Sequence, residues 1–216
     1  MEFRLIYPGP LLASQRDETR QARRIHAHEI RRKLHSQLEE QWRVQPALNW
    51  LKTASIQDKG APHRARVDEL ADKYIRRGIH FAPLVSEDYG MACGLDILFL
   101  RRGERGKVIQ TGDLDNRIKT FFDALSVPQE NQIPDDLDPG QEPNPFYCLL
   151  ADDSLITHFR ITADRLLLSE QEALTALVRT DSKDQGAQSP ESMVCLIISV
   201  RTVNTDRLKS LAECDL

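Results

Sequence analysis

Two aspartates, Asp113 and Asp115, are separated by a single residue at the start of the stretch GDLDNRIKTFFDAL, and Lys119 follows within it. A second acidic pair, Asp152 and Asp153, comes later, with Asp153 28 residues after the end of that stretch. Carboxylates gathered in one site repel each other unless a cation neutralises them, and hard oxygen ligands favour Mg²⁺ or Mn²⁺. Such an ion acidifies bound water and stabilises charge on phosphoryl oxygens, and a nearby lysine adds a donor for the transition state.

Simpler structural roles compete with this interpretation. One aspartate before an apolar helix is most often an N-cap, worth about 1 kcal/mol. Asp115 and Lys119 could form a surface i,i+4 pair worth a few tenths of a kcal/mol, at roughly the level of other exposed pairs. Asp152 and Asp153 could be turn residues before a strand. A cap uses only one aspartate, however, and the sequence supplies two. D-x-D spacing alone also occurs in glycosyltransferases and phosphohydrolases.

Helical counting places the charges along one edge of a helix from about Asp115 to Leu125. At 100° per residue, the apolar side chains fall on one face and Asp115, Lys119 and Asp123 fall along its edge. The apolar face consists of Ile118, Phe121, Phe122 and Leu125. The pattern therefore predicts a carboxylate and an ammonium at the border between core and solvent.

The string DLDNRIKTFFDAL, followed by an apolar-D-D pair, resembles the RusA family of Holliday-junction resolvases. That family's motif runs D-L-D-N-x-x-K-x-x-x-D-A-L before an aspartate pair. The residues that match in register are Asp113, Leu114, Asp115, Asn116, Lys119, Phe122, Asp123, Ala124 and Leu125, with Asp152 and Asp153 as the pair. The opening IYPGP also resembles the family's first strand and its proline-rich turn.

The resemblance implies a small α/β homodimer that binds four-way (branched) DNA and cuts opposite strands with Mg²⁺, or with Mn²⁺. By position it implies that Asp113, Asp115 and Asp153 are metal ligands, with Asp152 as a neighbour, and that Lys119 is the catalytic cation. The first candidates for contacts with DNA phosphates are Arg101, Arg102, Arg105 and Lys107, just before the motif. The alternatives are a catalytically inactive RusA-like DNA-binding or assembly protein, and a D-x-D phosphohydrolase. The second needs an apolar strand running into the first aspartate, and the segment KVIQTG is too polar for that.

The surrounding sequence predicts an α/β (α+β) fold, with a mixed β-sheet and helices packed against it. We expect a single domain over residues 1–216, with a helical insertion at about 36–77 and an acidic loop at about 126–149. Alternation and apolar runs predict strands at 2–7, 79–85, 91–101, 154–162 and 193–203, with a turn closing the first at YPGP. Helical spacing predicts helices at 17–44, 64–77 and 169–180.

Two charged segments outside the motif are also candidates for function. The predicted helix at 17–44 carries a basic set that could face phosphates or simply be solvated: Arg20, Arg23, Arg24, Arg31, Arg32 and Lys33. The acidic connection at 126–149 has no basic neighbours in sequence, so we expect a solvated loop. Its carboxylates are Glu130, Asp135, Asp136, Asp138 and Glu142.

Composition favours a globular protein that works without a membrane span. The chain is 40% hydrophobic and 29% charged, and no apolar run is long enough to cross a bilayer. The first residues do not form a signal peptide pattern, and the four cysteines show no metal or disulfide spacing, so we expect a cytoplasmic location. The net charge is -4, but residues 1–112 hold 20 Lys/Arg against 14 Asp/Glu. This uneven distribution leaves a polyanionic partner open.

Overall fold

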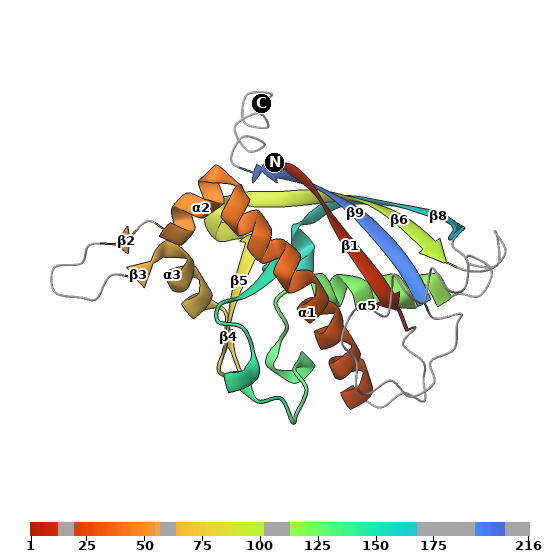
Figure 1. The fold of residues 1–216 in the computed structure, drawn as a ribbon, viewed down its shortest axis with the longest axis horizontal. Helices are drawn as coiled ribbons and strands as arrows, with labels where there is room; N and C mark the ends of the chain where they lie inside the picture. The colour runs from red at the N-terminus through yellow and green to blue at the C-terminus, as the bar shows by residue number, and fades with distance from the viewer. Residues whose placement is uncertain (13–19, 54, 57–63, 102–112, 168–192, 206–216) are drawn as a thin grey trace, which may run out of the picture.

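The structure is a computed structural model, and it describes residues 1–12, 20–53, 55–56, 64–101, 113–167 and 193–205. Within these ranges the chain forms two mixed sheets and four α-helices (Figure 1). The predicted α+β class is therefore confirmed. No helix in this part of the chain is long and apolar enough to cross a membrane.

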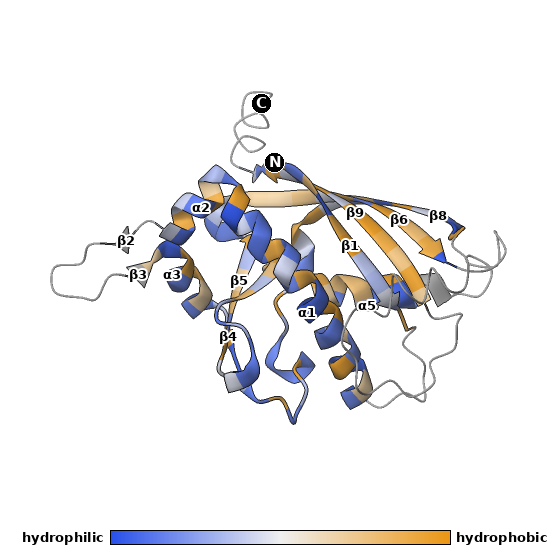
Figure 2. Cartoon of the chain, viewed as in Figure 1, coloured by the Kyte–Doolittle hydropathy of each residue, from blue (hydrophilic) through white to orange (hydrophobic). Residues whose placement is uncertain are grey.

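The larger sheet has the order β1-β9-β6-β8. Its strands are β1 (Glu2–Pro10), β9 (Met193–Asn204), β6 (Met91–Arg101) and β8 (Ile156–Arg165). Strand β9 runs antiparallel to both of its neighbours, whereas β6 and β8 are parallel. Along β1 the side chains of Phe3, Leu5 and Tyr7 are buried while those between them are more exposed. One face of this sheet therefore lies on the core, and its apolar stripes are visible in Figure 2.

The prediction of a turn at YPGP is wrong. Strand β1 continues through Pro10, with Pro8 opposite Cys195 and Pro10 opposite Met193 of β9. Proline has no backbone N–H and is therefore confined to positions where no ladder donor is needed, such as an edge strand. Because β1 is the edge of its sheet, it accommodates both prolines without breaking.

The smaller sheet shows that part of the predicted acidic loop is a buried strand. It consists of β4 (Ile75–Arg76), β5 (Ile79–Val85) and β7 (Phe146–Leu150), with β5 and β7 parallel. All five residues of β7 are buried, although they fall almost entirely within the segment for which we expect a solvated loop. A short, uninterrupted apolar run is typical of a strand covered on both faces. A two-residue pair, β2 (Ser55–Ile56) and β3 (Arg64–Ala65), lies apart from both sheets.

The four helices are α1 (Arg20–Val44), α2 (Pro46–Thr53), α3 (Arg66–Lys73) and α5 (Asp113–Leu125). Helix α3 is shorter than the predicted 64–77, because β3 and β4 take up its two ends. A two-residue turn with positive φ at Arg77 and Gly78 then reverses the chain into β5. Residues 17–19, the basic segment 102–112 and the helix predicted at 169–180 lie outside the described residues.

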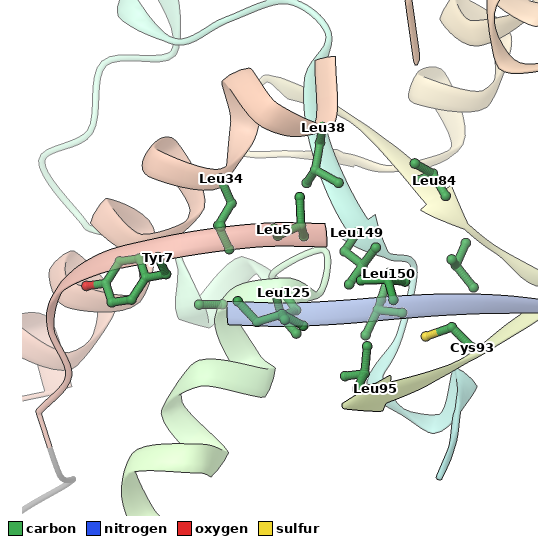
Figure 3. Close-up of a cluster of buried hydrophobic side chains, with 14 of the residues drawn as sticks. Leu5, Tyr7, Leu34, Leu38, Leu84, Cys93, Leu95, Leu125, Leu149 and Leu150 are labelled. Carbon is green, nitrogen blue, oxygen red and sulfur yellow. The ribbon is translucent and has the colours of Figure 1, made fainter. Parts of the chain in front are cut away.

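Helices α1 and α5 pack on the core with strands from both sheets. Figure 3 shows Leu34 and Leu38 of α1 beside Leu5 of β1, with Leu125 of α5 and Leu149 of β7 in the same cluster. The region predicted as a helical insertion contributes to this cluster as well, through Trp42, Leu48 and Leu70. The core thus fixes α1 and α5 relative to the end of β7, which is the arrangement that positions the candidate site.

Candidate functional site

Helix α5 has the orientation that its apolar spacing predicts. Ile118, Phe121 and Leu125 are buried, whereas Asp115 and Lys119 are exposed and Asp123 is partly buried. Phe122 packs edge-on against Phe159 of β8, with ring centroids 5.2 Å apart. The charged edge of α5 is therefore held at the boundary between core and solvent.

After β7, the chain comes back to lie beside helix α5. The backbone N–H of Ala151, just after β7, donates to the carbonyl of Val85 at 2.9 Å, and Ser126 pairs with Leu150. The following turn, η4 (Asp153–Leu155), lies against α5. The long connection after α5 therefore brings Asp153 close enough to act electrostatically on Asp123.

Burial, and not the net effect of the neighbouring charges, opposes ionisation of Asp123. Burial raises the pKa of its carboxyl group, and the negative charge of Asp153 raises it further, while Lys119 and Arg31 act in the opposite direction. Two carboxylates near each other favour a cation or a proton between them, and cation binding by this cluster stays a prediction.

Asp152 has a clear structural role. Its Oδ1 accepts the backbone N–H of Ser154 at 3.0 Å, which caps η4. Hydrogen bonds from Ser154, through its side chain and then its backbone, lower the pKa of Asp152. The interpretation of Asp152 as a turn residue is therefore confirmed, and a ligand role for it stays a prediction. Asp153 is exposed and begins the turn that Asp152 caps.

Other predicted site residues lie at or beyond the border of the described structure. Asp113 begins the backbone of α5, but its side chain lies outside the described residues, as do Arg102, Arg105 and Lys107 entirely. Arg101 ends β6, and its carbonyl accepts the backbone N–H of Leu166 at 2.8 Å. Among the described side chains, no three His, Cys, Asp or Glu residues form a metal-binding group. The ligand set of Asp113, Asp115 and Asp153 therefore stays a prediction.

A cavity of about 630 Å³ lies between the N-terminal half of α1 and α5. Four members of the basic set, Arg20, Arg23, Arg24 and Arg31, line it from α1. Helix α5 lines the opposite side, partly with the same edge that carries the motif: Asn116, Lys119, Thr120 and Asp123. Three carboxamides that follow α5 complete the lining, Gln129, Asn131 and Gln132. Sequence reasoning missed these three because they belong to no motif.

Arg31 fastens α1 to the C-terminal end of α5. It is 2% exposed, and it donates from Nε to the Ser126 carbonyl at 3.1 Å and from Nη2 to the Asp123 carbonyl at 2.8 Å. The last carbonyls of a helix have no intrahelical partner, so a buried cation is well placed to satisfy them. This contact holds the cavity's two walls together.

Among the carboxylates of the acidic connection, the prediction of a solvated loop is wrong for Glu142, which is buried, but not for Glu130, Asp135, Asp136 and Asp138, which are exposed. Two of the exposed carboxylates nevertheless have partners in α1. Asp135 pairs with Arg24 at 2.8 Å and with Arg77 at 2.9 Å, and Asp136 accepts a hydrogen bond from Gln21 at 2.7 Å. The connection contains two short turns, η2 (Glu130–Gln132) and η3 (Pro139–Gln141). Most of these partners come from α1, far away in sequence, so no local pattern could have shown them.

Glu142 is the most deeply placed of these carboxylates, at 7% exposed. Arg32 donates to it with two nitrogens, and Nε2 of His28 lies 3.3 Å from its Oε2. Burial opposes ionisation of Glu142, but its interactions with His28 and Arg32 outweigh burial and lower its pKa to about 2. Glu142 is thus a buried anion that ties the acidic connection to α1.

No family model, curated protein or solved structure matches this chain. The candidate site is therefore defined by its own geometry, which joins the charged edge of α5, the turn η4 and a basic cavity beside them.

Proposed function

We propose that this chain is a Mg²⁺-dependent, structure-specific DNA endonuclease of the RusA type, which resolves four-way junctions by paired phosphodiester hydrolysis. The observation that supports the proposal most is the return of the chain after β7, which sets Asp153 against the helix that carries Asp115 and Lys119. Asp153 and Asp123, which are far apart in sequence and both match the motif, thus lie close enough to interact electrostatically.

The donors present suit a hard divalent cation. The carboxylates are oxygen ligands, Asp115 and Asp153 are exposed, and the charge of Asp153 adds to the effect of burial in raising the pKa of Asp123. Asp115 and Asp153 would hold Mg²⁺ together with Asp113. When bound, the ion would lower the pKa of water and stabilise charge on the phosphoryl oxygens.

The chain's own residues would supply the remaining functions. Lys119 lies one helical turn from Asp115, with its side chain exposed, and would donate to the negative charge that develops on the phosphate. The apolar face of α5 holds this edge in place through Ile118 and Phe121. Rigid positioning of this kind matters because small displacements of catalytic groups reduce rates strongly.

A homodimer is part of the proposal, as is action in the cytoplasm. Junction resolution requires two symmetric nicks, and a twofold dimer supplies two sites related as the two strands are. The alternative function, an inactive DNA-binding or assembly protein, would keep the fold and the basic cavity but would not cut.

A cleavage assay separates the two functions. A labelled four-way junction and a linear duplex of the same sequence are incubated with the protein and either Mg²⁺ or EDTA. We expect paired symmetric nicks in the junction alone, abolished by EDTA and by the Asp115→Asn substitution. Asp138→Asn, a substitution in the acidic connection, serves as the control and should cut normally. Tight junction binding without cleavage in any divalent metal would establish the inactive alternative instead.

A further inference from the structure

We infer that the cavity between α1 and α5 binds a backbone phosphate of the DNA strand, next to the phosphate that is cut. The inference rests on the proposed function only for the identity of the polymer. The phosphate-binding character of the cavity comes from its own charges and geometry.

The cavity lining is strongly cationic. Arg20, Arg23, Arg24, Arg31 and Lys119 line it, and the carboxylate among the lining residues belongs to Asp123. A concave surface lined mainly by one sign of charge concentrates the field and attracts the opposite charge. Guanidinium groups are particularly suited to phosphate because their planar N–H donors match two phosphate oxygens.

Arg31 provides evidence that this is a formed site rather than a chance gathering of surface charges. Its Nε and Nη2 donate to the carbonyls of Ser126 and Asp123, whereas its buried Nη1 has no hydrogen-bond partner in the described part of the chain. A buried donor without a partner is costly, particularly on a charged group. An anion in the cavity that Arg31 lines would satisfy this donor.

Arg24 already has a partner. Its Nη1 donates to both carboxylate oxygens of Asp135 at 2.8 Å, and Asp135 also pairs with Arg77. A phosphate that used Arg24 would displace Asp135, which is 61% exposed and would keep its pair with Arg77. The acidic connection then occupies part of the basic surface until DNA arrives.

The cavity also has a defined relation to the proposed catalytic edge. Lys119 and Asp123 belong to both, because they lie on the side of α5 that faces α1. A phosphate held by the α1 arginines would therefore lie directly beside the α5 edge. Asp123 would face it with a carboxylate, and the surrounding cations offset that repulsion.

The test is the salt dependence of junction binding, measured in EDTA so that no cleavage occurs. The double variant Arg20→Gln, Arg23→Gln removes two cavity cations, both exposed, and leaves Lys119 and Arg31 in place. Arg43→Gln is the matched control, since Arg43 is an exposed arginine of the same helix that pairs with Glu40 away from the cavity. Thermal unfolding confirms that all variants are folded.

Fluorescence anisotropy with a labelled four-way junction gives the binding constant at several salt concentrations. We expect the double variant to bind at least about tenfold more weakly, because its cavity attracts phosphate less strongly. Its plot of log K against log salt should be shallower by about 1 for each phosphate that the variant no longer neutralises. The control should keep the wild-type affinity and slope. An unchanged slope in the double variant would overturn the inference, even if the affinity fell.

Two further results separate this inference from the proposed function. If the double variant has the shallower slope but wild-type protein never cuts with Mg²⁺, the phosphate site stands and the nuclease proposal fails. If wild-type protein cuts and the double variant keeps its slope, the nuclease proposal stands and the phosphate site fails. Stabilisation by inorganic phosphate alone, abolished in the double variant while junction binding is unchanged, would assign the cavity to free phosphate and overturn the DNA assignment.

Discussion

Glu142 should make the stability of this chain depend on pH in the acid range. Its carboxylate is buried and is bound by Arg32, with His28 close to it. Its pKa is lowered to about 2 in the folded chain, from an ordinary value of 4.5. Because the unfolded chain binds the proton more tightly, stability from this group is fully present above pH 4.5 and is lost as the pH falls towards 2.

The magnitude follows from the two pKa values. The difference between about 2 and 4.5 corresponds to about 3 kcal/mol in favour of the folded chain at about pH 7. At about pH 3 the carboxylate is almost fully protonated in the unfolded chain and still mostly ionised in the folded one, so about 2 kcal/mol of that contribution is gone.

The assay is urea unfolding of wild-type protein and the Glu142→Gln variant at about pH 7 and about pH 3. The difference in free energy of unfolding between the two proteins should be about 2 kcal/mol smaller at the lower pH. Glu40→Gln, at an exposed pair with Arg43, is the control and should show almost no such change. A Glu142→Gln difference that stays constant over this range would refute the assigned pKa and the buried ion pair behind it.

Other expected outcomes concern the helix edge and strand β7. Lys119→Ala should slow junction cleavage at least about 100-fold, as removal of a transition-state donor does, with metal and junction binding nearly intact; an unchanged single-turnover rate would remove Lys119 from the mechanism. Leu149→Ala, at a fully buried position of β7, should lower the free energy of unfolding by about 2 to 5 kcal/mol in urea titrations. A change well under about 1 kcal/mol would show that β7 is not core.

The orientation of α5 can be predicted from the sequence because the information for it is local. Apolar residues at helical spacing require one buried face, and the charged edge then follows from geometry. The bounds of β5 and β6 are predictable for a similar reason, since each is a mostly apolar run interrupted by one polar residue, His80 in β5 and Asp96 in β6. Strand β7 escapes prediction because its five apolar residues directly follow a polar, proline-rich segment and look like the end of that loop.

The partners of the acidic connection cannot be predicted in the same way. Arg32 and Glu142 are 110 residues apart in sequence, and Arg24 and Asp135 are 111 apart. Such pairs depend on how the sheet and α1 pack, which no local pattern contains. The cavity depends on the same packing, so sequence reasoning could identify its arginines but not that four of them would face α5.

Mn²⁺ binding by single-aspartate variants can decide whether α5 and η4 form one metal site. Binding is followed by electron paramagnetic resonance in wild-type protein, Asp115→Asn, Asp153→Asn and the control Asp138→Asn. If the two elements share one ion, each of the first two substitutions should weaken binding at least about tenfold, since even the indirect supports of a metal site matter that much. The control should bind as wild type does. Equal Mn²⁺ affinity in all four proteins would contradict a shared site and would leave GDLDNRIKTFFDAL as a capped, amphipathic helix.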